Sequence, residues 1–197
     1  MNTLLVNCYL READQKMPPY RALCVAHSDE VREVLAGELA PGFDRSGIGA
    51  VVITGSQWML AQEPPSQSLA GFCSGLRVPT LGICFGHQLL ASSFGRKVAR
   101  GEKFLEFHER VELFADWPLF EGLGTEALMR ESHREFVTPE SLAASGWQLG
   151  ARSASCPVEA MRHPELPLYG VQFHPERSAE PGARLVGNFL RNVAGRG

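Results

Sequence analysis

The sequence lacks any apolar run approaching 18 residues, so no segment of it is predicted to cross a membrane. It has no internal repeat and no low-complexity stretch. Positive charge is not in excess either, because 19 Lys and Arg stand against 22 Asp and Glu, a formal net charge of −3 at pH 7. That balance argues against a protein that binds nucleic acid through bulk electrostatics.

Closely spaced cysteine pairs are also missing. No two of the five cysteines have the spacing of a zinc site or of a dense disulfide framework. An odd number of cysteines without a signal peptide predicts a reducing, cytoplasmic location. The cysteines are Cys8, Cys24, Cys73, Cys84 and Cys156.

The length of 197 residues suits a single α/β domain over residues 1–197. Short apolar runs alternate with stretches of helical periodicity, which predicts a largely parallel central sheet with helices on both faces. The early strands are expected at 3–9, 21–27, 50–54 and 78–83, the helices at 30–39, 66–74, 88–94 and 181–193, and a loop at 11–20.

The first candidate for chemistry is Cys84, which lies between the strand predicted at 78–83 and the helix predicted at 88–94. Gly82 and Gly86 flank it and permit a tight bend with positive φ. Unpaired N–H groups and the helix dipole favour an anion at a helix N-terminus, so a thiolate is stabilised there. The alternative is a buried structural cysteine, which is the commoner case for this residue type.

The second candidate is the stretch from Tyr169 to Glu176, whose alternation of apolar residues predicts a strand. On a strand, His174 and Glu176 point the same way because side chains alternate with period two. The carboxylate can then hold one imidazole nitrogen while the other nitrogen faces a thiol. Cys84, His174 and Glu176 would form the nucleophile, base and orienting group of covalent catalysis. His133 is a rival base, ranked lower because we expect no carboxylate to orient it.

Together, the stretches Gly82-Ile83-Cys84-Phe85-Gly86-His87-Gln88 and Gly170-Val171-Gln172-Phe173-His174-Pro175-Glu176 resemble the two signatures of class I, triad-type glutamine amidotransferases. Their order and their separation of 90 residues match that family as well. The resemblance covers nearly the whole chain and is similar to the stand-alone, GMP-synthase-like glutaminase domains. It implies a flavodoxin-like α/β fold.

The resemblance also implies how the reaction centre is built. The backbone N–H groups of Gly55 and Phe85 would form an oxyanion hole, which stabilises charge that develops in the transition state. Gln88 follows Cys84 by one helical turn and would contact the substrate glutamine.

A further stretch matches the part of the family that lines the glutamine pocket. Ser132 and His133 stand where relatives have a Ser-His pair. Arg134 and Glu135 follow, where relatives often have small or aromatic residues. These charges would bind the head group of glutamine or the end of another γ-glutamyl substrate; a solvated loop is the equal alternative.

The implied reaction is hydrolysis of the glutamine side-chain amide through a cysteine γ-glutamyl thioester, with ammonia supplied to a separate synthetase. This reaction needs no metal ion and no organic cofactor. Two alternatives stay open. The chain is either a stand-alone hydrolase of γ-glutamyl peptides or amides, or a catalytically silent regulatory protein that binds glutamine or a partner.

Overall fold

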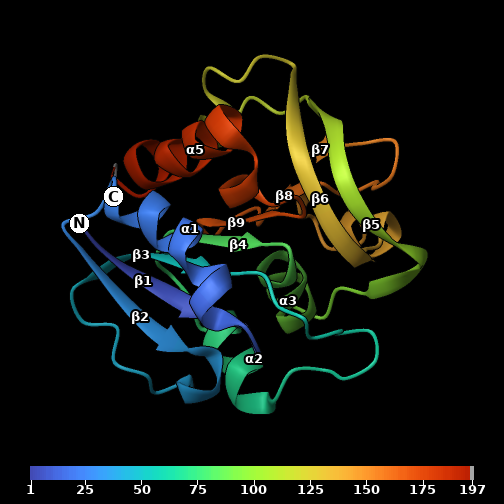
Figure 1. Cartoon of the computed structure of the whole chain (residues 1–197). Helices are drawn as coiled ribbons and strands as arrows, with labels where there is room; N and C mark the ends of the chain where they lie inside the picture. The colour runs from blue at the N-terminus through green and yellow to red at the C-terminus, as the bar shows by residue number, and fades with distance from the viewer. Residues whose placement is uncertain (196–197) are drawn as a thin grey trace.

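The computed structural model describes residues 1–195, which form one mixed sheet with helices on both faces (Figure 1). The order across the sheet is β2-β1-β3-β4-β9-β8-β7-β5-β6. The first five strands in this order run parallel, and the other four continue the sheet antiparallel. The strands are β1 (Asn2–Asn7), β2 (Glu30–Leu35), β3 (Ile48–Ile53), β4 (Thr80–Ile83), β5 (Val98–Leu113), β6 (Glu126–Val137), β7 (Gln148–Arg152), β8 (Ala160–Arg162) and β9 (Leu168–Val171).

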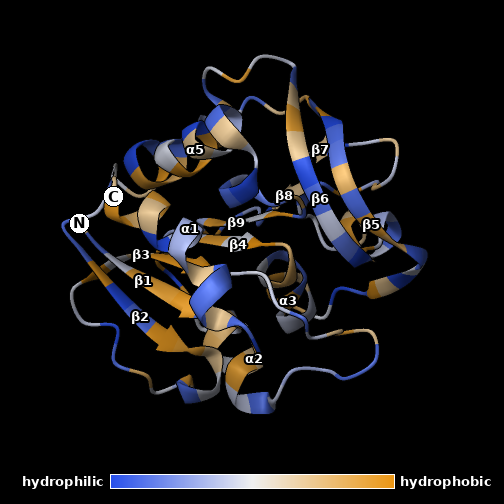
Figure 2. Cartoon of the chain, viewed as in Figure 1, coloured by the Kyte–Doolittle hydropathy of each residue, from blue (hydrophilic) through white to orange (hydrophobic). Residues whose placement is uncertain are grey.

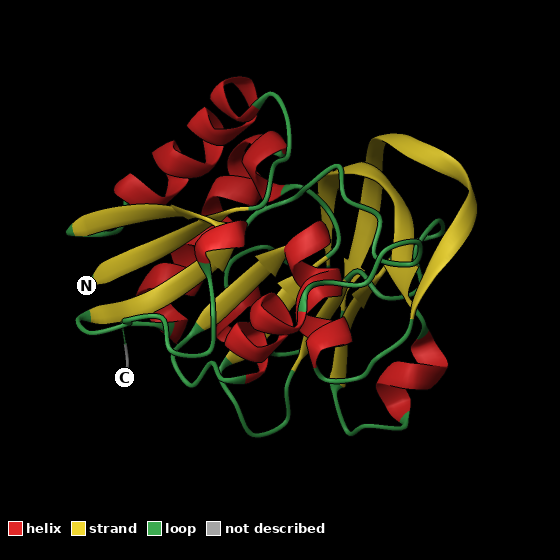
Figure 3. Ribbon diagram, turned by 90° about the horizontal axis from the view of Figure 1, so that it is seen from below, coloured by secondary structure: helices red, strands yellow, loops and turns green. Residues whose placement is uncertain are grey.

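The helices divide the core into two layers. Helices α1 (Ala13–Val25) and α5 (Ala179–Asn188) cover one face of the parallel strands, and α2 (Gln67–Ser74) and α3 (Phe85–Ser93) cover the other (Figures 1 and 3). A short helix α4 (Pro139–Ala143) lies between β6 and β7. The predicted α/β fold with helices on both faces is therefore confirmed, with an antiparallel extension.

The central strands are buried on both sides, as strands covered by two helical layers must be. Figure 2 shows hydrophobic residues concentrated on β1, β3 and β4, and the side chains of β3 from Ala50 to Ile53 are almost fully buried. Within residues 1–195, no helix is long and apolar enough to span a membrane.

The predictions for residues 11–39 were wrong. The expected loop and second strand form α1, although Pro18 and Pro19 lie inside that helix. A proline in a helix interior costs about 3 kcal/mol, but both prolines are on the exposed side. The opposite side carries a buried stripe of Met17, Tyr20 and Cys24, and its packing against the sheet outweighs that penalty.

The expected helix at 30–39 is the edge strand β2, followed by a short 3₁₀ turn. Along this strand Val31 and Val34 are less exposed than Glu30 and Arg32. Pairing with β1 satisfies the backbone of β2, whereas a helix of this sequence would have no continuous apolar face to bury.

Candidate active site

The parallel strands bring three loops to one edge of the sheet. β3, β4 and β9 are neighbours, so Gly55, Cys84 and His174, which follow their carboxyl ends, meet there. This edge is where open α/β sheets place ligands.

Cys84 forms a strained turn between β4 and α3, with φ 51° and ψ −101°. The positive φ predicted for the flanking glycines belongs to the cysteine itself. The glycines serve close approach instead: a Cβ on Gly82 would overlap the carbonyl oxygen of Gly86, and a Cβ on Gly86 would overlap that of Ile53. The sulfur is thereby presented at the start of a helix.

The strain at Cys84 predicts an inversion of the usual effect of glycine on stability. We expect Cys84→Gly to be more stable than Cys84→Ala by about 1 kcal/mol, because only glycine adopts this φ and ψ without strain. Chemical unfolding of the two variants measures the difference. The same pair at Ala91, in the interior of α3, is the control and should show alanine more stable. Equal or reversed stabilities at position 84 would contradict the strained turn.

His174 and Glu176 form a buried pair. The Glu176 carboxylate accepts a hydrogen bond from Nδ1 of His174 at 2.6 Å. Both residues lie beyond β9, at a 3₁₀ turn over Pro175–Arg177, so the prediction that a strand aligns them was wrong in its reason. The turn brings the two side chains together because Pro175 sharply redirects the chain.

The charge state of His174 follows from its neighbours. Burial lowers the pKa of His174, but the Glu176 carboxylate and the Cys84 sulfur lie close enough to outweigh it and raise the pKa well above its ordinary value. The imidazole is therefore protonated at neutral pH. An imidazolium beside a sulfur favours the thiolate, which is the nucleophilic form of cysteine.

Tyr20 of α1 supports the back of this site. Its hydroxyl accepts the N–H of Gly55 at 3.2 Å and lies 3.5 Å from Nδ1 of His174 and 3.2 Å from the Tyr9 hydroxyl. Burial raises the pKa of Tyr20 well above its ordinary value, so the phenol stays neutral. The helix that carries Tyr20 thus links the β3 loop to the histidine.

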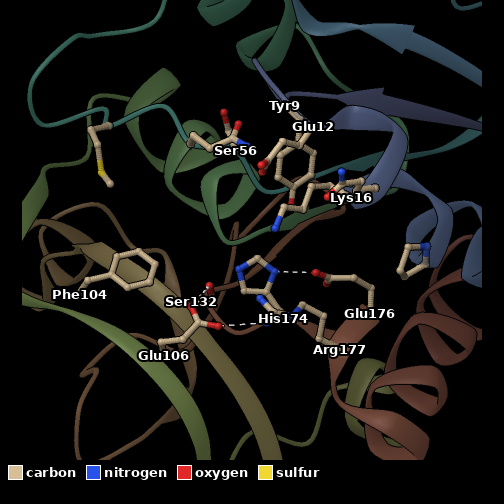
Figure 4. A pocket seen from close by; sticks show the side chains of 14 residues that line it. Tyr9, Glu12, Lys16, Ser56, Phe104, Glu106, Ser132, His174, Glu176 and Arg177 are labelled. Carbon is tan, nitrogen blue, oxygen red and sulfur yellow. Dashed lines mark hydrogen bonds and ion pairs between the residues drawn. The ribbon is translucent and has the colours of Figure 1, made fainter.

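A pocket of about 530 Å³ opens beside His174 (Figure 4). Figure 4 shows His174 and Glu176 facing it, with Tyr9 and Glu12 on one side and Ser132 and Glu106 on the other. A smaller space of about 30 Å³ adjoins the Cys84 sulfur, and the two spaces share four lining residues. These shared residues are Ser56, Met59, Phe104 and Ser132.

Glu106 organises one wall of this pocket. Its carboxylate accepts hydrogen bonds from Ser132 at 2.7 Å and from Arg177 at 3.0 Å, and it pairs with Arg130. Burial raises the pKa of Glu106, but these three groups outweigh it and lower the pKa to about 2. Since Arg177 directly follows Glu176, the cluster ties β5 and β6 to the turn that carries the histidine.

The pKa of Glu106 predicts a pH dependence for that tie. A carboxyl group whose pKa is lower in the folded state contributes stability above its ordinary value near 4.5 and loses it as the pH falls towards 2. We expect Glu106→Gln to lower the denaturant midpoint at pH 7, with the difference from the parent shrinking between pH 4.5 and 2. Glu102→Gln on the same strand is the control. A difference that is constant over this range would contradict the assignment.

A family comparison decides the class of this site. Residues 62–193, which include the cysteine and the histidine, match the model of the glutamine amidotransferase class-I family. The chain belongs to the class I glutamine amidotransferases.

Relatives of this amidotransferase extend the match. The glutamine-hydrolyzing subunit of the GMP synthase of Thermococcus kodakarensis is 44% identical over 133 residues, 64% of this chain and 69% of the relative. The corresponding protein of Methanopyrus kandleri is 38% identical over 81% of this chain and 83% of the relative. The alignment with its Pyrococcus furiosus counterpart spans 60% of that relative.

Solved structures share the fold. A protein of Thermoplasma acidophilum, proposed to be the same GMP synthase component, superimposes with a TM-score of 0.85 at 23% identity, covering 100% of this chain and 95% of the other. A glutamine amidotransferase of Thermotoga maritima gives a TM-score of 0.76 at 17% identity, covering 98% of each chain.

The amidotransferase has a second buried histidine–carboxylate pair, which we did not expect. Nε2 of His133 lies 3.1 Å from Glu131, and its Nδ1 lies 3.0 Å from the main-chain oxygen of Glu135. The prediction that His133 lacks a carboxylate was wrong: Glu131 is two residues away on β6 and therefore on the same side of the strand. The neighbouring main-chain oxygen of Ser132 lies 3.8 Å from the Cys84 sulfur.

The other predicted substrate contacts lie around the same space beside the sulfur, but their polar ends are engaged within the protein. Arg134 donates to the main-chain oxygens of Gly101 and Glu102, and Glu135 accepts the N–H of Ala61. The proposed contact of these charges with glutamine stays a prediction, and it requires one of these bonds to be exchanged.

Proposed function

We propose that this amidotransferase hydrolyses the side-chain amide of glutamine and supplies the ammonia to a separate synthetase subunit. One observation carries this proposal: the strand ends bring the Cys84 sulfur to the His174–Glu176 pair, beside a pocket. The GMP synthase components among its relatives suggest a nucleotide synthetase as the acceptor.

The proposed reaction has two halves. The Cys84 thiolate attacks the amide carbon of glutamine, and the imidazolium of His174 donates its proton to the leaving nitrogen. Ammonia departs and a γ-glutamyl thioester remains on the sulfur. Neutral His174 then takes a proton from water, the hydroxide attacks the thioester, and glutamate and the thiolate are released. Glu176 orients the imidazole through both halves.

The oxyanion of each half would be held by backbone N–H groups. Phe85 opens α3, and the first N–H groups of a helix have no acceptor within it. Gly55 is the proposed second donor, but its N–H is bonded to Tyr20 in this structure. The proposal therefore requires the β3 loop to exchange this bond when substrate binds.

The test compares the chain alone with the chain plus the synthetase subunit of a GMP synthase. We expect slow release of ammonia from glutamine by the chain alone and faster release with the partner and its other substrates. γ-Glutamyl dipeptides serve as competing substrates. A clear preference for the dipeptides, with no effect of the partner, would instead support a stand-alone γ-glutamyl hydrolase. A single domain over residues 1–197 acting in the cytoplasm is part of the same proposal.

A further inference from the structure

Gln172 contacts the nucleophile and has no role in the reaction described above. It follows β9 and is fully buried. Its Nε2 lies 3.6 Å from the Cys84 sulfur, within hydrogen-bonding distance for sulfur, and its Oε1 lies 3.0 Å from Nε2 of Gln88. The side chain therefore bridges the nucleophile and the helix that follows it.

The surrounding bonds fix which end of the Gln172 amide faces the sulfur. The main-chain oxygen of Glu135 can only accept, so the group of Gln88 that lies 2.8 Å from it must be the NH₂. The same NH₂ faces Gln172, which must therefore present its oxygen to Gln88. The NH₂ of Gln172 is left to face Cys84.

The network extends further into β6. The main-chain oxygen of Glu135 also accepts from Nδ1 of His133, whose Nε2 is bonded to Glu131. A continuous buried chain of hydrogen bonds thus runs from a β6 carboxylate to the sulfur. Such a chain holds each amide in one orientation, because reversing any of them would set two donors or two acceptors against each other.

We propose that Gln172 stabilises the Cys84 thiolate by donating a side-chain N–H to the sulfur, and that Gln88 acts as a positioning residue that orients Gln172. His174 supplies charge to the thiolate and Gln172 supplies a fixed dipole. Both hydrogens of the Gln88 amide nitrogen are used in this network. Gln88 then serves the sulfur through Gln172, and only its oxygen is left to meet a substrate. This inference rests on the proposed function only for its effect on turnover.

The test measures the alkylation of Cys84 by iodoacetamide as a function of pH without glutamine, followed by peptide mapping. Gln172→Met keeps the length of the side chain and removes the donor. We expect about tenfold slower alkylation at pH 7 and a rate profile displaced to higher pH, since a hydrogen bond to a charged group has about this effect. We also expect kcat for glutamine to fall about tenfold with KM little changed.

Two further variants separate this role from packing. Gln172→Glu has the same shape but places an oxygen at the sulfur, so it should be alkylated more slowly than Gln172→Met. Gln88→Met leaves Gln172 in place without its orienting partner, and about threefold slower alkylation is expected from partial loss of the bond. Gln148→Met, on the exposed side of β7, is the control and should match the parent.

Folded variants of Gln172 and Gln88 that are alkylated as fast as the parent at every pH would overturn the inference. If Gln172→Met does not fold, the Gln88→Met result decides in the same way. The outcome is independent of the proposed function: a parent that shows the alkylation profile but releases no ammonia from glutamine would refute glutamine hydrolysis and leave the role of Gln172 at the sulfur intact.

Discussion

Replacing Cys84 by alanine is expected to lower the rate of ammonia release from glutamine by at least about 10⁴-fold, because no other group can form the γ-glutamyl thioester. The fold should persist, since alanine keeps the Cβ that the turn into α3 accommodates. Ammonia release and the unfolding midpoint measure the two effects separately.

The control for this variant is Cys73→Ala. Cys73 is a fully buried cysteine on α2, within the helical layer that also holds α3. Its replacement creates a cavity and should reduce stability while activity remains. Full activity of Cys84→Ala would refute its role as the nucleophile.

Replacing Glu176 by glutamine should reduce kcat by about 10²- to 10⁴-fold while the protein stays folded. The carboxylate is an acceptor for Nδ1–H of His174 at 2.6 Å, and it is the leading charge that raises the pKa of that histidine. An amide can turn its NH₂ towards Nδ1, which would place the imidazole proton on Nε2. The histidine would then lose both its orientation and its charge at neutral pH.

The measurement is kcat against pH for Glu176→Gln and its parent. Because the pKa of His174 falls in the variant, the protonated imidazole is lost at lower pH, and the remaining activity should decline at lower pH than in the parent. Glu180→Gln is the matched control: Glu180 is exposed on α5 and pairs with Arg184, one turn along. Equal kcat values for Glu176→Gln and the parent would remove Glu176 from the catalytic group.

The sequence predicted the centre of this site better than its surroundings. The glycines around Cys84 and the spacing of His174 and Glu176 are local features, so the residues alone carried the prediction. Even there the reason differed from the structure, since a 3₁₀ turn and not a strand aligns the last two residues. The turn still places a carboxylate two residues after the histidine within reach of it.

The surroundings depend on contacts between segments far apart in the chain. Tyr20 was missed because two prolines hid the helix that carries it, and only packing of that helix on the sheet reveals the stripe it belongs to. Gln172 stands inside the second signature motif, but its role depends on Gln88 and on the main-chain oxygen of Glu135. No local pattern encodes that meeting.

The central claim is that one cysteine carries the γ-glutamyl group beside the histidine. The most direct measurement treats the protein with a glutamine analogue that has an electrophilic diazoketone in place of the amide, then maps the modified peptide and follows ammonia release. We predict one adduct per chain, on Cys84, formed in proportion to the loss of activity and slowed by excess glutamine. Complete inactivation with Cys84 unmodified, or an adduct on another of the five cysteines, would contradict the account.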